Sequence, residues 1–169
     1  MSTQLFINAH IATGMPGSTA AETAAIQDIL VEDGKFISIA PHLKATLEAQ
    51  GKDMASVEVV DLGGKLVCPP FCDTHLHLDY VFTARKPGAV NESGTLFEGI
   101  QRWSETKADL TVDEIKERAK IGIAKEMRHG VQFIRSHADV TDPNLTSLKA
   151  LLELKEELKD TVTLQIVSF

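Results

Sequence analysis

The stretch "LVCPPFCDTHLHLD", residues 66–79, decides how the rest of the chain is interpreted. Two prolines interrupt an apolar run, and His75 and His77 follow two residues apart. Residues two apart in a strand point to the same face, so both imidazoles can reach one metal ion. The alternative is a pair of histidines that are hydrogen-bonded at a strand end and bind no metal.

The two cysteines of this stretch, Cys68 and Cys72, have the opposite parity to the histidines. A flat strand places them on its other face, so a compact Cys2His2 zinc site within residues 68–77 has poor geometry. We expect two buried free thiols instead. Two cysteines are also too few for a disulfide framework, which fits a reducing cytoplasm.

The composition is that of an ordinary globular protein, with 169 residues, 43% hydrophobic and 24% charged. A net charge of −7 disfavours binding to nucleic acids and to membrane surfaces. No stretch approaches the roughly 20 apolar residues of a membrane helix, and the N-terminus does not resemble a signal peptide. We therefore expect a cytoplasmic protein without nucleic-acid or membrane partners.

Residues 1–65 contain short strand-like runs separated by turn residues. The segment "IQDILVEDGKFISIAP" predicts a hairpin with Asp33-Gly34 as its turn, and Gly63-Gly64 ends a later strand. We expect this part to be all-β and too small to hold a core of its own.

From about residue 94 the hydrophobic period becomes helical. Leu96, Ile100 and Trp103 form one stripe, and Thr111 with Glu114 predicts a capping box at the start of the next helix. Gly130 stands where a glycine commonly follows a helix.

The segments "VQFIRSHADV" and "TVTLQIVSF" predict two further strands, the second one buried. Between them Asp142-Pro143 predicts the start of a helix. The leucines that we expect to face inward from this helix are Leu145, Leu148, Leu152 and Leu158. Repeated βα units imply a parallel sheet covered by helices, with sites at the carboxyl ends of the strands.

The opening stretch resembles the first-strand signature of the amidohydrolase superfamily. "NESGTLFEGIQRW", "IRSHADVTD" and "LTSLKALLELKEELKDTVTLQIVSF" are similar to the elements that follow it in the cytosine deaminase-like branch. The resemblance implies an α/β fold: residues 66–169 as the first three strands and associated helices of the (β/α)8 TIM barrel of a metal-dependent hydrolase. Residues 1–65 are then part of a small β-sandwich domain.

The resemblance also implies roles for individual residues. His75 and His77 would ligate one divalent metal ion, either zinc or iron, with manganese also possible. Gln165 would bind the substrate base, because an amide offers both a donor and an acceptor; the alternative is a glutamine that satisfies neighbours in the sheet. Leu96 would pack over the base, although an apolar residue at a helix start needs no ligand to explain it.

His137 and Asp139 lie at the end of the second strand with the same two-residue parity. The resemblance places them behind the metal ligands as supporting residues. A structural histidine satisfied within the fold is the alternative for His137.

The implied reaction is metal-dependent hydrolytic deamination of a cytosine-like nitrogen heterocycle, a small molecule. One alternative is another hydrolysis of a C–N bond on a heterocycle such as a triazine or creatinine. An alternative of a different class is a non-catalytic fragment that acts only in assembly.

A (β/α)8 barrel takes about 250 residues, so we expect this chain to hold an incomplete barrel. The resemblance places the remaining metal ligands and the general acid/base beyond residue 169, which leaves no catalytic residue here. We expect an N-terminal portion that is inactive alone and requires the remainder of the barrel, on the same or another chain. When complete, the enzyme is expected to form a homo-oligomer.

Overall fold

The structure is a computed structural model that describes residues 2–11 and 25–169. The chain divides into two compact units, Met1–Pro69 and Pro70–Phe169. The boundary lies four residues after the expected one, because strand β5 (Leu66–Val67) pairs with β1 (Thr3–Ile11) of the first unit. No helix among the described residues is long and apolar enough to cross a membrane.

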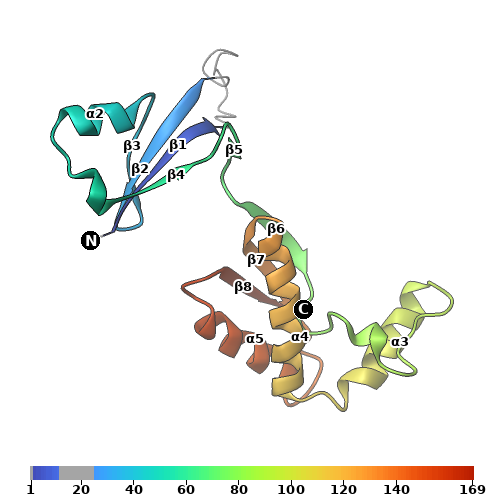
Figure 1. Ribbon diagram of the computed structural model, residues 1–169. Helices are drawn as coiled ribbons and strands as arrows, with labels where there is room; N and C mark the ends of the chain where they lie inside the picture. Colours follow the sequence, from blue (N-terminus) through green and yellow to red (C-terminus); the bar gives the residue numbers. More distant parts are fainter. Residues whose placement is uncertain (1, 12–24) are drawn as a thin grey trace. The chain divides into compact units, whose positions relative to one another are not determined.

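The first unit contains one five-stranded mixed sheet within the described residues (Figure 1). Its strand order is β3-β2-β1-β4, and β5 pairs with β1. The other strands are β2 (Ile26–Glu32), β3 (Lys35–Ala40) and β4 (Val57–Asp61). The β2–β3 hairpin turns at Asp33 and Gly34, whose φ angles of 47° and 76° suit the tight turn predicted there.

The expectation that this unit is all-β and lacks a core is wrong. Helix α2 (Leu43–Ala49) and a single 3-10 turn, η1 (Met54–Ser56), follow the hairpin. Leu43 of α2 joins a buried cluster with residues of the sheet, namely Leu5, Leu30 and Val57. With only two helical turns, α2 has too few apolar positions for its period to stand out in the sequence.

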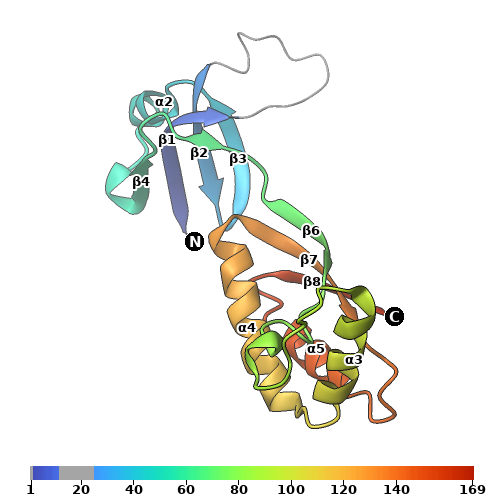
Figure 2. The same cartoon turned by 90° about the vertical axis from the view of Figure 1, so that its right-hand side faces the viewer.

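The second unit contains a three-stranded parallel sheet with the order β6-β7-β8 (Figures 1 and 2). Its strands are β6 (Phe71–Leu76), β7 (Val131–Ala138) and β8 (Thr163–Ser168). Its helices are η2 (Thr83–Arg85), α3 (Leu96–Lys107), α4 (Val112–Arg128) and α5 (Thr146–Glu157). This is the predicted succession of βα units.

One face of this sheet is buried and the other is exposed. Ile134 and Ser136 of β7 and Leu164 of β8 lie in the core, whereas Phe133 and Gln165 are exposed. Strand β8 therefore alternates between buried and exposed residues, whereas we expected it to be buried throughout. The α4–α5 layer supplies the rest of this core, mainly Ile115, Ala119, Ile123, Leu151 and Leu154.

Helix α4 begins and ends as its sequence predicts. Thr111 and Glu114 form the reciprocal capping box, and Gly130, with φ 85°, follows the C-terminus. Gly122 faces the core, where a Cβ atom would lie 3.4 Å from a methyl group of Leu78. The helix is therefore specified both at its ends and along its buried stripe.

Helix α5 differs from its prediction in start and orientation. It begins at Thr146 and not at Pro143, because Asp142 accepts hydrogen bonds from the backbone amides of Asn144 and Thr146 and forms a turn. Leu145 is the N-cap, with φ 52°. The fully buried leucines are Leu151 and Leu154, while Leu145 and Leu152 are partly exposed and Leu148 and Leu158 pack at the edge of the core.

Candidate active site

Three histidines meet at the carboxyl ends of β6 and β7. His75 lies in β6 and His77 directly follows it, and their Nε2 atoms are 3.2 Å apart. His137, near the end of β7, joins them, with its ring centroid 4.2 Å from that of His75 and 5.6 Å from that of His77. The parallel pairing of β6 with β7 is what brings these side chains together.

The spacing of His75 and His77 fits chelation of one ion. Two nitrogen ligands, each about 2.1 Å from a tetrahedral metal, lie about 3.4 Å apart. The observed 3.2 Å therefore needs almost no rearrangement. In the part of the chain that the structure describes, no group of three or more histidine, cysteine or acidic side chains is arranged to hold a metal ion.

The two cysteines contribute no disulfide and are free. Cys68 and Cys72 are both exposed, so the expectation that they are buried is wrong. Cys72 lies on the uncovered face of the sheet, and Cys68 lies in the Pro-rich segment between β5 and β6.

Within the histidine cluster, His77 favours the neutral form of its imidazole. Burial, and then the neighbouring His75 and His137 rings, lower the pKa of His77, and a backbone contact with His137 opposes this effect only in part. The Nδ1 atom of His137 is buried and makes no hydrogen bond to the described residues. Neutral imidazole is the form that binds metal ions.

A cavity of about 470 Å³ opens beside His77. Its size suits a small organic ligand. Leu96, predicted to pack over the substrate, lines it from α3. The aromatic residues that complete its wall were not identified from the sequence, and they are Tyr80, Trp103 and Phe169.

Tyr80 and Trp103 connect the histidines to helix α3. The Tyr80 ring stacks on His77 at 4.8 Å between centroids, and Trp103 packs against Tyr80 at 4.9 Å. Tyr80 follows the His-x-His motif by three residues, and Trp103 belongs to the predicted helical stripe. Those two positions are the signals by which the sequence could have identified them.

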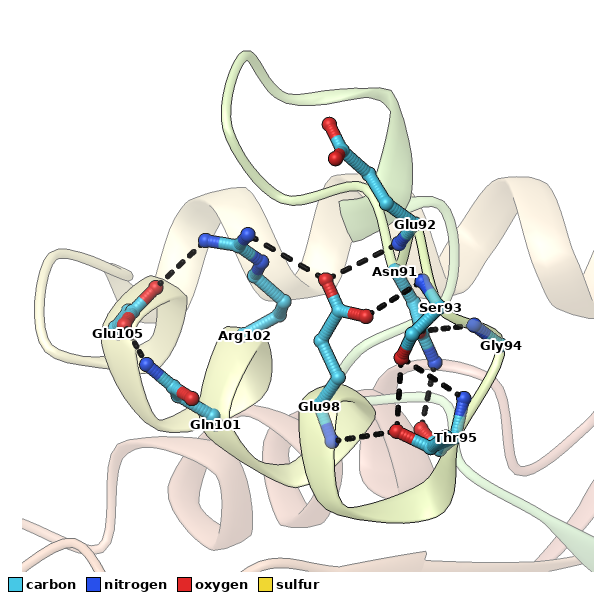
Figure 3. Close-up of polar contacts among 9 residues, drawn as sticks. All are labelled: Asn91, Glu92, Ser93, Gly94, Thr95, Glu98, Gln101, Arg102 and Glu105. Carbon is cyan, nitrogen blue, oxygen red and sulfur yellow. Dashed lines mark hydrogen bonds and ion pairs between the residues drawn. The ribbon is translucent and has the colours of Figure 1, made fainter.

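The loop before α3 is folded onto the first turn of that helix (Figure 3). The Glu98 carboxylate accepts hydrogen bonds from the backbone amides of Glu92 (3.1 Å) and Ser93 (2.7 Å). Hydrogen bonds from Ser93 are the main reason why the pKa of Glu98 falls to about 2. Asn91, which lines the cavity, accepts from the amide of Gly94 and donates to the carbonyl of Thr95.

Asp139 lies at the end of β7 with 5% of its surface exposed. One carboxylate oxygen accepts from Trp103 Nε1 (2.5 Å) and Lys107 Nζ (2.8 Å), and the other accepts from the Thr141 amide and hydroxyl. Burial acts to raise the pKa of Asp139, but the hydrogen bonds, first that of Lys107, hold it at about 2. Asp139 is therefore an ionised group that binds α3.

Asp79, two residues after His77, is fully buried and was not identified from the sequence. Its carboxylate accepts hydrogen bonds from the backbone amides of Asp139 (2.9 Å) and Tyr80 (3.1 Å). Burial raises its pKa. The aspartate that ends the quoted "HLHLD" motif thus ties the end of β6 to the end of β7.

Gln165 is not brought together with His77 and Leu96. It lies on the exposed face of the sheet and lines a separate hollow with Cys72, Thr74 and Arg135. Its amide oxygen accepts a hydrogen bond of 2.7 Å from Arg135 Nε. Arg135 occupies one lone pair of this oxygen, so the second lone pair and the amide nitrogen of Gln165 stay available to a ligand.

Comparison with known proteins places these features in a wider context. A sequence model described as the Amidohydrolase family matches residues 58–156. N-isopropylammelide isopropyl amidohydrolase of Pseudomonas sp. (strain ADP) is 29% identical over 88% of this chain and 36% of its own length. Pterin deaminase of Rhizobium rhizogenes is 27% identical over 83% of this chain and 30% of its own length.

Among solved structures, 5-methylcytosine deaminase from Klebsiella pneumoniae, liganded with 5-fluorocytosine, superposes with a TM-score of 0.79 at 38% identity. The match covers 98% of this chain and 36% of that enzyme. The chain thus spans about a third of the length of the proteins it matches. The predicted α/β fold, with the first part of a TIM barrel, is confirmed.

Proposed function

This chain belongs to the amidohydrolase family, and on that premise we propose that it forms part of a metal-dependent hydrolase that deaminates a cytosine-like nitrogen heterocycle. The observation that carries this proposal is the pair of Nε2 atoms of His75 and His77, 3.2 Å apart beside a 470 Å³ cavity. A chelating pair next to a ligand-sized cavity is one part of the arrangement that such hydrolysis requires.

His75 and His77 would hold a divalent ion, which can be zinc, iron or manganese. When bound, such an ion supplies the Lewis acid that activates water for hydrolysis. The remaining ligands and the group that transfers the proton are proposed to lie outside residues 1–169, on the remainder of the barrel. Asp79 and Asp139 support the histidines by tying together the ends of β6 and β7.

The residues of the cavity would bind and orient the substrate. Leu96 and Ile100 offer an apolar surface, and the Tyr80 and Trp103 rings can pack against a flat heterocycle. The predicted contact of Gln165 with the base stays part of the proposal. Its amide nitrogen would donate to an acceptor atom of the substrate, and the lone pair of its oxygen that Arg135 leaves open would accept from a donor.

A second candidate is removal of an alkylamine from a triazine ring. The observation that favours it is the relative that hydrolyses N-isopropylammelide, together with the apolar wall at Leu96 and Ile100, which can accept an alkyl group. Assaying ammonia and alkylamine release separately, over cytosines, pterins and N-alkylated triazines, distinguishes the two activities.

Metal analysis of the complete protein tests the proposal. The double substitution His75→Ala/His77→Ala should sharply reduce the bound divalent metal. His129→Ala is the matched control, because His129 is an exposed histidine that caps α4, and it should keep its metal. Full metal content in the double variant would refute the ligand assignment.

Substrate kinetics test the Gln165 assignment separately. Gln165→Ala should lower kcat/KM by roughly 5- to 150-fold, the equivalent of the 1–3 kcal/mol lost with an unmatched hydrogen bond, without altering metal content. Unchanged kinetics on every substrate that the enzyme accepts would remove Gln165 from the site.

A further inference from the structure

Helix α3 forms one wall of the cavity but is weakly embedded in its unit. None of its residues is buried, and Leu96, Phe97 and Ile100 are all more than half exposed. Figure 1 shows α3 set apart from the α4–α5 layer. Apart from the half-buried Trp103, which packs against the edge of the core, apolar burial therefore contributes little to holding this wall in position.

Two polar anchors from α3 converge on a single carboxylate oxygen. Trp103 Nε1 and Lys107 Nζ, one helical turn apart, lie 2.5 and 2.8 Å from the same Oδ2 atom of Asp139. Lys107 is only 20% exposed in its side chain, and Asp139 only 7%. Hydrogen bonds to charged groups at such burial are stronger than those between neutral groups.

The carboxylate that receives these anchors cannot rotate freely. The amide and hydroxyl of Thr141 occupy its other oxygen, at 2.7 and 2.6 Å. The backbone amide of Asp139 is in turn bound to the buried Asp79. These contacts fix the position of α3 relative to the end of β7, the strand that also carries His137.

We propose that Asp139 is a positioning residue which, through Trp103 and Lys107, fixes the distance between the α3 wall and His77 and so determines how tightly the cavity holds its ligand. This inference rests on the proposed function in that the ligand is taken to be a small heterocycle. Asp139 itself lines no part of the cavity. Its effect is transmitted by the Trp103 ring, which packs on Tyr80, the residue stacked on His77.

Tryptophan fluorescence tests the anchoring without reference to any activity. Trp103 is the only tryptophan of the chain, so its emission reports on this contact directly. In the 169-residue chain, Lys107→Met should shift the emission to longer wavelength and increase quenching by acrylamide. Lys107→Arg, which retains a charged donor, should restore the original values.

The control for this experiment is Lys120→Met. Lys120 of α4 forms an exposed ion pair with Glu157 of α5, so its loss should leave the Trp103 emission unchanged. Circular dichroism establishes that each variant is folded, and Asp139→Asn provides a second way to weaken the anchor. Unchanged quenching in folded Lys107→Met and Asp139→Asn would overturn the proposal.

Steady-state kinetics of the complete enzyme separate positioning from simple structural support. Lys107→Met should raise KM about tenfold, as expected for one charged hydrogen bond, with kcat little changed and with recovery in Lys107→Arg. A loss of kcat at constant KM would contradict the positioning role. If no heterocycle is turned over by the wild type, the proposed function fails, while the fluorescence result still decides the anchoring.

Discussion

Helices α4 and α3 follow one another in the chain but are held in different ways. Helix α4 buries Ile115, Ala119 and Ile123 in the core, and a capping box closes its N-terminus. Helix α3 buries no residue and depends on polar contacts at Glu98 near its start and Lys107 at its end. Helix α4 is held by the non-directional burial of apolar side chains, and helix α3 by directional hydrogen bonds.

This difference separates stability from ligand binding within one unit. A change in α4 should appear in the free energy of unfolding, because its side chains fill the core. A change in α3 should instead alter the cavity, since the helix contributes Leu96, Ile100 and Trp103 to the wall but little to the core. Three experiments test this division.

The largest effect is expected at Ile115, which is fully buried on α4. Ile115→Ala should lower the free energy of unfolding by about 2–5 kcal/mol, through lost burial and the cavity left behind. Denaturant unfolding measures this change. Ile121→Ala is the control, because Ile121 is 54% exposed on the same helix and should change stability by no more than about 0.5 kcal/mol. Equal losses of stability in the two variants would contradict the distinction between buried and exposed positions of α4.

An intermediate effect is expected from acid, through Asp139. Its pKa lies at about 2 in the folded chain and at 3.8 ordinarily, so its ionised form stabilises the fold. That stability is fully present above about pH 4 and is lost as the pH falls through about 2, a difference of roughly 2 kcal/mol. Between pH 6 and pH 2, the free energy of unfolding should therefore change less with pH in Asp139→Asn than in the wild type.

Asp79 acts on the same titration with the opposite sign. Burial raises its pKa, so the folded chain gains relative stability as this carboxyl is protonated. Comparing Asp79→Asn with Asp139→Asn therefore separates the two contributions. Acid unfolding that is identical in wild type and Asp139→Asn would show that the bonds from Trp103 and Lys107 do not stabilise the fold.

The smallest and most local effect is expected at Glu98. Glu98→Gln replaces one acceptor by an amide group, which cannot accept from both Glu92 and Ser93. Hydrogen exchange of the 91–95 loop should accelerate, while global unfolding stays unchanged. Glu105→Gln is the control on the same helix, since Glu105 pairs with Arg102 and Gln101 and with no loop amide. Equal exchange in both variants would show that Glu98 does not hold the loop.

Where local signals are strong and mutually consistent, the sequence predicts the structure well. The capping box of Thr111 and Glu114, the long apolar period of α4 and Gly130 all specify one helix, and it forms as expected. The same holds for the hairpin at Asp33-Gly34. The α/β fold class followed from the alternation of such elements and from the resemblance.

The errors arise where tertiary contacts or turn chemistry outweigh a local pattern. Asp142 binds two backbone amides in a turn and so delays the start of α5, and this helix buries Leu151 and Leu154 instead of Leu152. For the candidate site, the sequence indicated the parity of His75 and His77. The cluster with His137 and the anchoring of α3 at Asp139 depend on strand pairing and on contacts 32 to 36 residues apart, which no local pattern contains.

Gly122 limits the free energy of unfolding of this fold. A glycine in a helix interior disfavours folding by up to about 1 kcal/mol relative to alanine, because the unfolded chain has more backbone freedom to lose. Here an added methyl group would meet Leu78 at 3.4 Å and Val81 at 3.6 Å, which are ordinary contact distances. Alanine should therefore fit with at most slight adjustment of flexible side chains. The chain is thus less stable than it could be at this position, in one of the two helices that supply the core of the second unit.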